Sequence, residues 1–193
     1  MKLRGLYAVT PESADLTARV RQALEGGVAL LQYRSKRPDA AQLKEIVRMC
    51  RGFGVPVIVN DDVELALEAG ADGAHLGRED GDLSAARKKL AGRILGASCY
   101  NEPALALAAV RAGADYIAFG SVFRSPTKPH AVHASLGLFK QVYGVPLAAI
   151  GGITLDNAPQ VIGAGADLVA VISDLFDAPD VARRAAQYGK LFQ

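Results

Sequence analysis

One phrase recurs along this chain and limits how it can fold. Gly70-Ala71-Asp72, Gly113-Ala114-Asp115 and Gly165-Ala166-Asp167 each follow a segment with apolar residues at helical spacing and precede a short apolar run. Such a pattern is typical of a helix that ends on glycine, a turn, and a buried strand. A related form, Gly26-Gly27-Val28-Ala29, lies near the start. The repeated unit is therefore one strand and one helix, not a long solenoid module.

The repeat predicts eight buried strands that alternate with eight helices. The expected strands are Gly5–Val9, Ala29–Tyr33, Val57–Val59, Gly73–Leu76, Ile94–Ser98, Tyr116–Phe119, Leu147–Ile150 and Leu168–Ile172. The expected helices are Leu16–Glu25, Ala40–Arg51, Val63–Ala69, Leu83–Leu90, Pro103–Ala112, Leu136–Val142, Asn157–Ala164 and Pro179–Leu191. Eight alternating units favour a closed (βα)8 TIM barrel, an α/β fold, over an open doubly wound sheet. We expect a single catalytic domain that spans residues 1–193 with short loops.

Composition agrees with one compact soluble domain. Hydrophobic residues make up 50% of the 193 and charged residues 22%, which allows a substantial core. Acidic and basic residues are interspersed around a net charge of +2, so we expect no nucleic-acid partner. No apolar run approaches the ~20 residues of a membrane span, and the first residues lack the apolar core of a signal peptide. We therefore expect a cytoplasmic protein without a membrane partner, and composition leaves a homo-oligomer open.

Two aspartates follow neighbouring strands of the expected barrel. Asp61 comes directly after the third strand, and Asp80 follows the fourth. Because parallel strands end at the same mouth, these carboxylates are expected to converge there and to bind Mg²⁺ beside a phosphate. The alternative for Asp61 is a helix cap, since Asp61-Asp62-Val63-Glu64 is close to a capping box. Asp62 could cap instead, and Asp82 is the natural cap for the helix after Asp80.

Three polar side chains alternate where the second strand ends. Gln32, Arg34 and Lys36 would point the same way from an extended chain. Two positive charges and one amide suit a diphosphate and the edge of a heterocycle. The alternative is a solvated polar loop, but the set begins inside a buried strand, which favours a functional role.

Two further segments suit phosphate. Gly151-Gly152 after the seventh strand and Ile172-Ser173 after the eighth match the place where TIM barrels bind phosphate through backbone N–H groups. The long loop over residues 120–136 carries Ser125-Pro126-Thr127-Lys128, whose hydroxyls and lysine suit phosphate oxygens. The alternative for this loop is a surface turn.

Other reactive side chains are given structural roles. We expect His75 to be a satisfied histidine of the core or wall, and we assign His130 and His133 no catalytic role. Cys50 and Cys99 are too few for a disulfide framework, and the chain has no Cys/His cluster with zinc spacing. No Ser/His/Asp or Cys/His catalytic set stands at suitable positions.

Taken together, these residues resemble the thiamine phosphate synthase family, nearly end to end from Leu6 to Ser173. The matching motifs are Gln32-x-Arg34-x-Lys36, Asn60-Asp61, His75-x-Gly77-x-x-Asp80, Ser125-Pro126-Thr127-Lys128 and Ile150-Gly151-Gly152-Ile153. Ser125 replaces the family's first threonine and keeps its hydroxyl. Ser98 matches the family's serine, but Tyr100 stands where a histidine is more usual.

The resemblance implies an alkyl-transferring enzyme that makes thiamine phosphate. It would join 4-amino-5-hydroxymethyl-2-methylpyrimidine diphosphate to a thiazole phosphate and release diphosphate, with Mg²⁺ as cofactor. The pyrimidine diphosphate would be held by Gln32, Tyr33, Arg34, Ser35, Lys36, Asn60, Ser98 and Lys128. The thiazole phosphate would be held by Ser125, Pro126, Thr127, Gly152, Ile172 and Ser173. Asp61 and Asp80 would bind the metal, and Arg34, Lys36 and Lys128 would act catalytically on the leaving group.

The implied chemistry agrees with the candidate residues that position and charge indicate without the resemblance. An electron-rich aminopyrimidine supports a cation at its methylene carbon once diphosphate leaves, so the protein must stabilise charge on the leaving group. The thiazole nitrogen already carries a lone pair, so no strong general base is needed. Two alternatives stay open: a related barrel isomerase (tautomerase) acting on the thiazole phosphate alone, and a barrel that binds ligands without catalysis. The first needs no diphosphate site, and the second would tolerate loss of Asp61 or Lys128.

Overall fold

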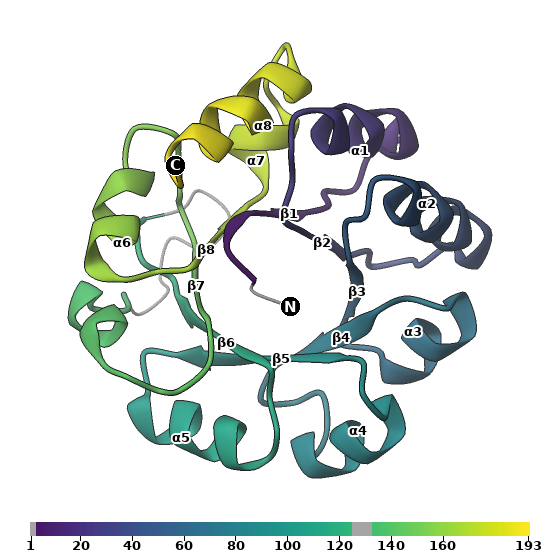
Figure 1. The fold of residues 1–193 in the computed structure, drawn as a ribbon. Helices are drawn as coiled ribbons and strands as arrows, with labels where there is room; N and C mark the ends of the chain where they lie inside the picture. Colours follow the sequence, from purple (N-terminus) through teal and green to yellow (C-terminus); the bar gives the residue numbers. More distant parts are fainter. Residues whose placement is uncertain (1–2, 125–132) are drawn as a thin grey trace.

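The protein is a closed barrel of eight parallel strands surrounded by helices, as the view down the barrel in Figure 1 shows. This computed structural model describes residues 3–124 and 133–193. The strands are β1 (Gly5–Val9), β2 (Leu30–Tyr33), β3 (Val57–Asn60), β4 (Gly73–Leu76), β5 (Ile94–Tyr100), β6 (Tyr116–Gly120), β7 (Leu147–Ile150) and β8 (Leu168–Val171). Each strand pairs with its neighbours in chain order, and β8 pairs with β1 to close the barrel. The predicted TIM barrel is confirmed, with strand ends displaced by one or two residues.

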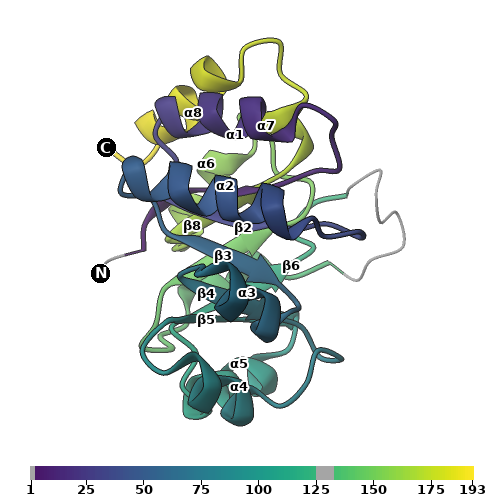
Figure 2. The same ribbon diagram turned by 90° about the vertical axis from the view of Figure 1, so that its right-hand side faces the viewer.

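The helices form an outer layer around the strands, which Figure 2 shows from the side. Their bounds are α1 (Leu16–Glu25), α2 (Ala40–Gly52), α3 (Val63–Ala69), α4 (Leu83–Leu90), α5 (Pro103–Arg111), α6 (Ala158–Ala164), α7 (Ser173–Phe176) and α8 (Val181–Lys190). None of the described helices is long and apolar enough to cross a membrane.

Two helical predictions need correction, and one short helix was not predicted. The segment expected to be an α-helix over Leu136–Val142 is a short 3₁₀ helix, η1 (Leu136–Lys140), in which Gly137 weakens helix formation. The last helix begins at Val181 because Asp180 accepts a hydrogen bond from the Arg183 N–H and caps it. The four-residue helix α7 was not predicted, since four residues are too few to carry a periodic pattern.

The strands separate two apolar cores. Residues on one face of each strand fill the barrel interior, and those on the other face pack against the helices. The interior cluster consists of Leu3, Tyr7, Val9, Leu30, Ile58, Tyr116, Ala118, Ala148, Leu168 and Ala170. Along β2, Leu30 belongs to the interior, whereas Leu31 and Tyr33 belong to the outer core. By this alternation the Gln32 side chain points into the barrel.

The Gly-Ala-Asp repeat holds the strands together at the end of the barrel opposite the predicted site. Each Asp donates its N–H to the carbonyl of a residue in the preceding strand and accepts that residue's N–H with its carboxylate. The pairs are Asp72 with Val57, Asp115 with Leu95 and Asp167 with Leu147. The bonds to the carboxylates measure 2.8, 2.8 and 3.0 Å. The glycines have φ of 70°, 92° and 117°, which explains why glycine ends each helix.

We predict that Asp72→Ala lowers the free energy of unfolding by about 1–3 kcal/mol, because it leaves the buried Val57 N–H without its acceptor. Asp72→Asn, which keeps an accepting oxygen, should lose less. Urea unfolding of the purified variants measures both. The control is Asp156→Ala, at an exposed residue for which the described part of the chain has no side-chain hydrogen bond. A loss at Asp72→Ala no greater than that of this control would contradict the role of the repeat.

Candidate active site

Asp61 is free of helix capping and stands at the barrel mouth. Asp62 caps α3 by accepting the Leu65 N–H at 2.8 Å, so Asp61 is not the helix cap that the sequence left open as an alternative. Asp61 has a positive φ of 65°, and its N–H donates to the His75 carbonyl at 2.8 Å. A residue in a left-handed conformation here is the kind of local strain found at functional sites.

The Asp61 and Asp80 carboxylates converge as the sequence predicts. Partial burial, together with the hydrogen-bond contact and the negative charge of Asp80, raises the pKa of Asp61 to about 6, against the opposing effects of the Asn60 amide and the Arg34 charge. Asp80 is itself fixed, since its Oδ2 accepts the Gly77 N–H at 2.7 Å. Asp82 caps α4 as expected, at 2.7 Å from the Ala85 nitrogen. Two carboxylates that repel one another form a site that favours a cation.

The described residues contain no cluster of three His, Cys, Asp or Glu side chains arranged for a metal. This arrangement differs from a structural metal site, which the protein closes with its own ligands. Mg²⁺ is commonly held by one or two carboxylates, with the remaining positions filled by water and substrate phosphate. Asp61 and Asp80 fit that second type of site.

The loop after β2 is held by residues that the sequence analysis did not single out. Thr10, at the end of β1, accepts the Arg34 N–H at 2.8 Å and donates its hydroxyl to the Arg34 carbonyl at 3.0 Å. Glu12 accepts the Lys36 N–H and the Ser35 hydroxyl, and chiefly the Lys36 N–H lowers the pKa of Glu12. Arg34 and Lys36 expose their side chains at the mouth. The only sign of Thr10 and Glu12 in the sequence is their position, directly after the first strand.

The Tyr33 side chain, which was also predicted to bind substrate, does not lie at the barrel mouth. It is buried in the outer core, where its hydroxyl accepts the Asp39 N–H at 3.1 Å and donates to Gln42 at 3.4 Å. It faces the helices rather than the barrel interior because it follows Gln32 by one position in an extended strand. Tyr33 therefore supports the loop after β2 from the side that faces the helices.

A chain of hydrogen bonds crosses the interior between two predicted substrate-binding residues. Gln32 donates to the Tyr7 hydroxyl, which lies 2.8 Å from the Tyr116 hydroxyl. The Tyr116 hydroxyl lies 2.7 Å from His75 Nδ1, and His75 Nε2 lies 2.8 Å from the Ser98 Oγ. His75 is satisfied, as predicted, and burial lowers its pKa to about 4 against the opposing effect of Asp80. Tyr7 and Tyr116 were not predicted as part of the site.

The glycine turn after β7 and the start of α7 lie where the sequence predicts a phosphate. Gly152 has φ of 63°, and a Cβ there would lie 2.4 Å from the Arg124 carbonyl oxygen. The Asn157 side chain closes this turn by donating to the Gly152 carbonyl at 2.9 Å. Ile172 immediately precedes α7, whose first residue is Ser173. A short extra helix after the eighth strand is a usual part of phosphate sites in such barrels.

Asp174, the second residue of α7, ties this region to the neighbouring helix. Its Oδ2 accepts hydrogen bonds from Arg184 at 2.6 Å and the Tyr188 hydroxyl at 2.7 Å, and from the Leu155 N–H at 3.3 Å. These bonds join α7, α8 and the loop after β7. Asp174 is thus a support of the turn and not a free acid.

Tyr100, which stands where the resemblance has a histidine, packs over the loop that carries Asp80. Its hydroxyl accepts the Arg78 N–H at 3.2 Å, and the Arg78 guanidinium lies 5.1 Å from the centre of its ring. Glu102 holds the same guanidinium in an ion pair. The predicted residues Ser125, Pro126, Thr127, Lys128 and His130 lie outside the described residues.

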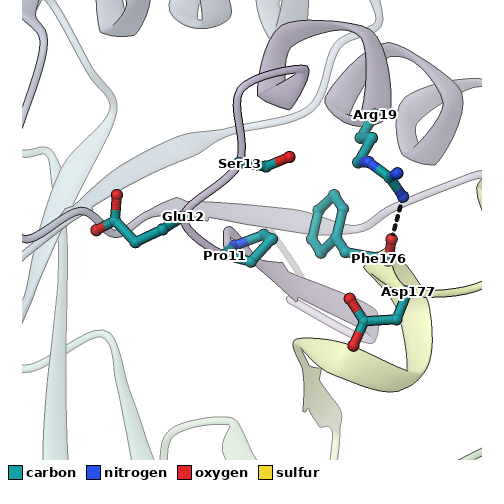
Figure 3. Close-up of a pocket in the computed structure, with 6 residues that line it drawn as sticks. All are labelled: Pro11, Glu12, Ser13, Arg19, Phe176 and Asp177. Carbon is teal, nitrogen blue, oxygen red and sulfur yellow. Dashed lines mark hydrogen bonds between the residues drawn. The ribbon is translucent and has the colours of Figure 1, made fainter.

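A pocket of about 320 Å³ lies beside the mouth, between the loop after β1 and the end of α7 (Figure 3). Its lining residues are Pro11, Glu12, Ser13, Arg19, Phe176 and Asp177. Arg19 donates to the Phe176 carbonyl, as Figure 3 shows, and also pairs with Asp15 at 2.9 Å. With its arginine engaged and two carboxylates in its wall, the pocket does not suit an anion, and the predicted site residues lie elsewhere.

A parallel barrel that gathers paired carboxylates, cations and a glycine turn at one mouth defines a barrel enzyme for phosphorylated small molecules. The sequence model of the family described as thiamine monophosphate synthase matches residues 6–175. The chain belongs to this family, and it is an enzyme that transfers a group.

Individual relatives agree over nearly the whole chain. A thiamine-phosphate synthase of Aromatoleum aromaticum is 61% identical over 202 residues, covering 99% of this chain and 97% of that protein. One of Thiobacillus denitrificans is 52% identical and covers 97% and 94%. The solved thiamine phosphate pyrophosphorylase from Pyrococcus furiosus superposes with a TM-score of 0.87 at 34% identity, covering 98% of this chain and 96% of that one. A 3-hexulose-6-phosphate synthase, 16% identical with a TM-score of 0.74, shares the fold.

We predict that, without divalent metal, Asp61→Asn is more stable than the wild type at pH 8 and that the difference shrinks toward pH 4. The pKa of about 6 in the folded protein exceeds the value near 4 of an unfolded Asp, so wild-type stability from this group is present at low pH and is lost as pH rises between them. After allowance for solvent screening, the difference at pH 8 should be on the order of 1 kcal/mol.

Urea unfolding in a chelator at several pH values measures this difference. Glu79→Gln, which removes an exposed carboxylate from the loop that carries Asp80, is the matched control and should show no such pH dependence. A stability difference for Asp61→Asn that does not change with pH would show that the pKa of Asp61 is not raised in the folded protein.

Proposed function

We propose that this chain condenses 4-amino-5-hydroxymethyl-2-methylpyrimidine diphosphate with a thiazole phosphate and releases diphosphate and thiamine phosphate. The observation that carries the proposal is the Asp61–Asp80 pair, with the Arg34 charge acting on it. A cation site beside a guanidinium is what a departing diphosphate requires. The similarity to thiamine-phosphate synthases supports the same reaction.

Asp61 and Asp80 would hold Mg²⁺, which when bound neutralises charge on the diphosphate. Both are oxygen donors, both face one mouth, and their mutual repulsion is relieved by a cation. Arg34 and Lys36 bind the diphosphate from the loop that Thr10 and Glu12 hold in place. Lys128, outside the described residues, is assigned to the same leaving group by its motif alone.

The bond changes need little from the protein beyond binding and charge. The methylene C–O bond breaks, and its electron pair leaves with the diphosphate. The aminopyrimidine shares the resulting positive charge, and the thiazole nitrogen lone pair then forms the new C–N bond. Gln32, Asn60 and Ser98 hold the pyrimidine so that its methylene faces the thiazole. No proton must be removed, so no general base is assigned.

The thiazole phosphate would lie at the other side of the mouth, at the ends of β7 and β8. Gly152 leaves room for the phosphate to approach the backbone, and Ile172 and Ser173 present the start of α7. Ser125, Pro126 and Thr127 are assigned here from their motif. The rival isomerase activity would need this phosphate site but neither Asp61 and Asp80 nor Arg34, so the synthase is favoured.

Product formation tests the proposal directly. The purified protein should convert the pyrimidine diphosphate and the thiazole phosphate into thiamine phosphate with Mg²⁺, and turnover should cease when a chelator removes the metal. Asp80→Asn should lower turnover by on the order of 10²-fold, because one metal ligand is lost. Glu79→Gln, one residue away, is the control.

Two results would contradict the proposal. One is no thiamine phosphate from wild-type protein that binds both substrates. The other is conversion of the thiazole phosphate alone into an isomer, without consumption of the pyrimidine diphosphate, which would favour the rival activity.

We also predict that Gly152→Val raises the KM for the thiazole phosphate at least about tenfold and the KM for the pyrimidine diphosphate much less. The new side chain would meet the Arg124 and Phe123 carbonyls, 2.4 and 2.8 Å from a Cβ, and push the turn into the phosphate site. Steady-state kinetics with each substrate varied in turn measures the two constants. The control, Gly144→Val, imposes similar backbone strain (φ of 82°) but has open space around its Cβ. Equal effects on both substrates would refute the assignment of two halves.

A further inference from the structure

The interior of the barrel carries a buried hydrogen-bond chain that a purely structural core does not require. Gln32, Tyr7, Tyr116, His75 and Ser98 come from β2, β1, β6, β4 and β5, and four hydrogen bonds join them in that order. Tyr7 and Tyr116 are almost wholly buried, and Gln32 and His75 are 4% and 7% exposed. Apolar side chains of similar volume would fill the space with no polar groups to satisfy.

Proton counting gives the chain a direction. Gln32 donates through its amide nitrogen to the Tyr7 oxygen, so the single Tyr7 proton goes to Tyr116. The Tyr116 proton then goes to His75 Nδ1, which must be unprotonated, and a neutral imidazole carries its proton on Nε2. That N–H donates to the Ser98 Oγ. Among the residues that the structure describes, two groups at the ends of this hydrogen-bond chain have no partner: the accepting Gln32 Oε1 and the donating Ser98 hydroxyl.

The backbone is shaped to admit this arrangement. A Cβ on Gly96 would lie 2.2 Å from the Tyr116 ring carbon that bears the hydroxyl and 2.3 Å from its oxygen. The glycine therefore makes the space through which Tyr116 reaches both Tyr7 and His75. The Tyr116 ring also meets Tyr7 edge to face, with centroids 5.8 Å apart.

We propose that Tyr7, Tyr116 and His75 are positioning residues that fix the Gln32 carbonyl as an acceptor and the Ser98 hydroxyl as a donor, and so select an aminopyrimidine. The exocyclic amino group of that ring donates a hydrogen bond, and its ring nitrogens accept one. An oxo-pyrimidine reverses part of this pattern and would leave buried polar groups unpaired. This inference rests on the proposed function and adds to it how the heterocycle is read.

Tyr116→Phe tests the inference, because it keeps the ring over Gly96 and removes only the central hydroxyl of the chain. The readout is equilibrium binding in Mg²⁺, without the thiazole phosphate, of three probes: the aminopyrimidine diphosphate, its 4-oxo analogue and inorganic diphosphate. The variant should lose about tenfold or more in affinity for the aminopyrimidine diphosphate and much of the preference for amino over oxo. Its affinity for inorganic diphosphate should stay within about twofold of the wild type.

The control is Tyr143→Phe, which removes a hydroxyl that donates to Gln141 at 2.8 Å near the opposite end of the barrel. It should leave all three affinities unchanged. Tyr7→Phe breaks the chain one bond earlier and serves as the second variant should Tyr116→Phe not fold. The inference is overturned if the variant binds the aminopyrimidine diphosphate as the wild type does, or if all three probes weaken together. Thiamine phosphate formation by the wild type, measured separately, tests the proposed function itself.

Discussion

The reciprocal hydrogen bonds of the repeated Asp residues are the constraint on which the site depends. Asp72, Asp115 and Asp167 each join the start of one strand to the strand before it, at the end of the barrel away from the chemistry. These bonds fix the register of β3 with β4, β5 with β6 and β7 with β8. Because side chains alternate along a strand, a slip of one residue would turn inward-facing side chains of these strands, such as Tyr116, from the barrel interior toward the helices. Stability at one end thus sets geometry at the other.

The sequence predicted most of the fold and the placement of the carboxylates because both follow from local patterns. Glycine at helix ends, short apolar runs and the strand-end rule place Asp61 and Asp80 at one mouth, and the structure brings them into contact. Helix α7 was not predicted. Its four residues are stabilised by the bond between Asp174 and Arg184 of α8, a contact between separate segments that no local pattern shows. Thr10 and Glu12 were missed for the same reason. A polar residue after a strand can form a hydrogen bond, but the sequence does not show which loop it will bind.

The interior chain marks the boundary of what local patterns reveal. Tyr7 and Tyr116 are 109 positions apart, and their meeting depends on the curvature of the barrel and on the missing side chain at Gly96. Each looks in the sequence like an ordinary aromatic residue of a buried strand. Burial of their hydroxyls nonetheless demands partners, and in the described part of the chain no buried side-chain nitrogen or oxygen lacks one. A tyrosine at an inward-facing strand position is therefore a usable signal for a polar interior.

The arrangement also suits the proposed reaction, in which one mouth would bind two anions without a catalytic base. Arg34 and the carboxylate pair occupy the ends of β2 to β4, whereas the glycine turn and α7 follow β7 and β8, across the ring in Figure 1. Separation keeps two phosphorylated groups from repelling each other at close range, and the barrel axis between them is where a methylene carbon and a ring nitrogen would meet. The polar chain from Gln32 to Ser98 lies beneath that point. A fixed donor and acceptor there would orient the heterocycle before the C–O bond breaks. The methylene carbon would then already face the thiazole nitrogen, which lowers the barrier to forming the C–N bond.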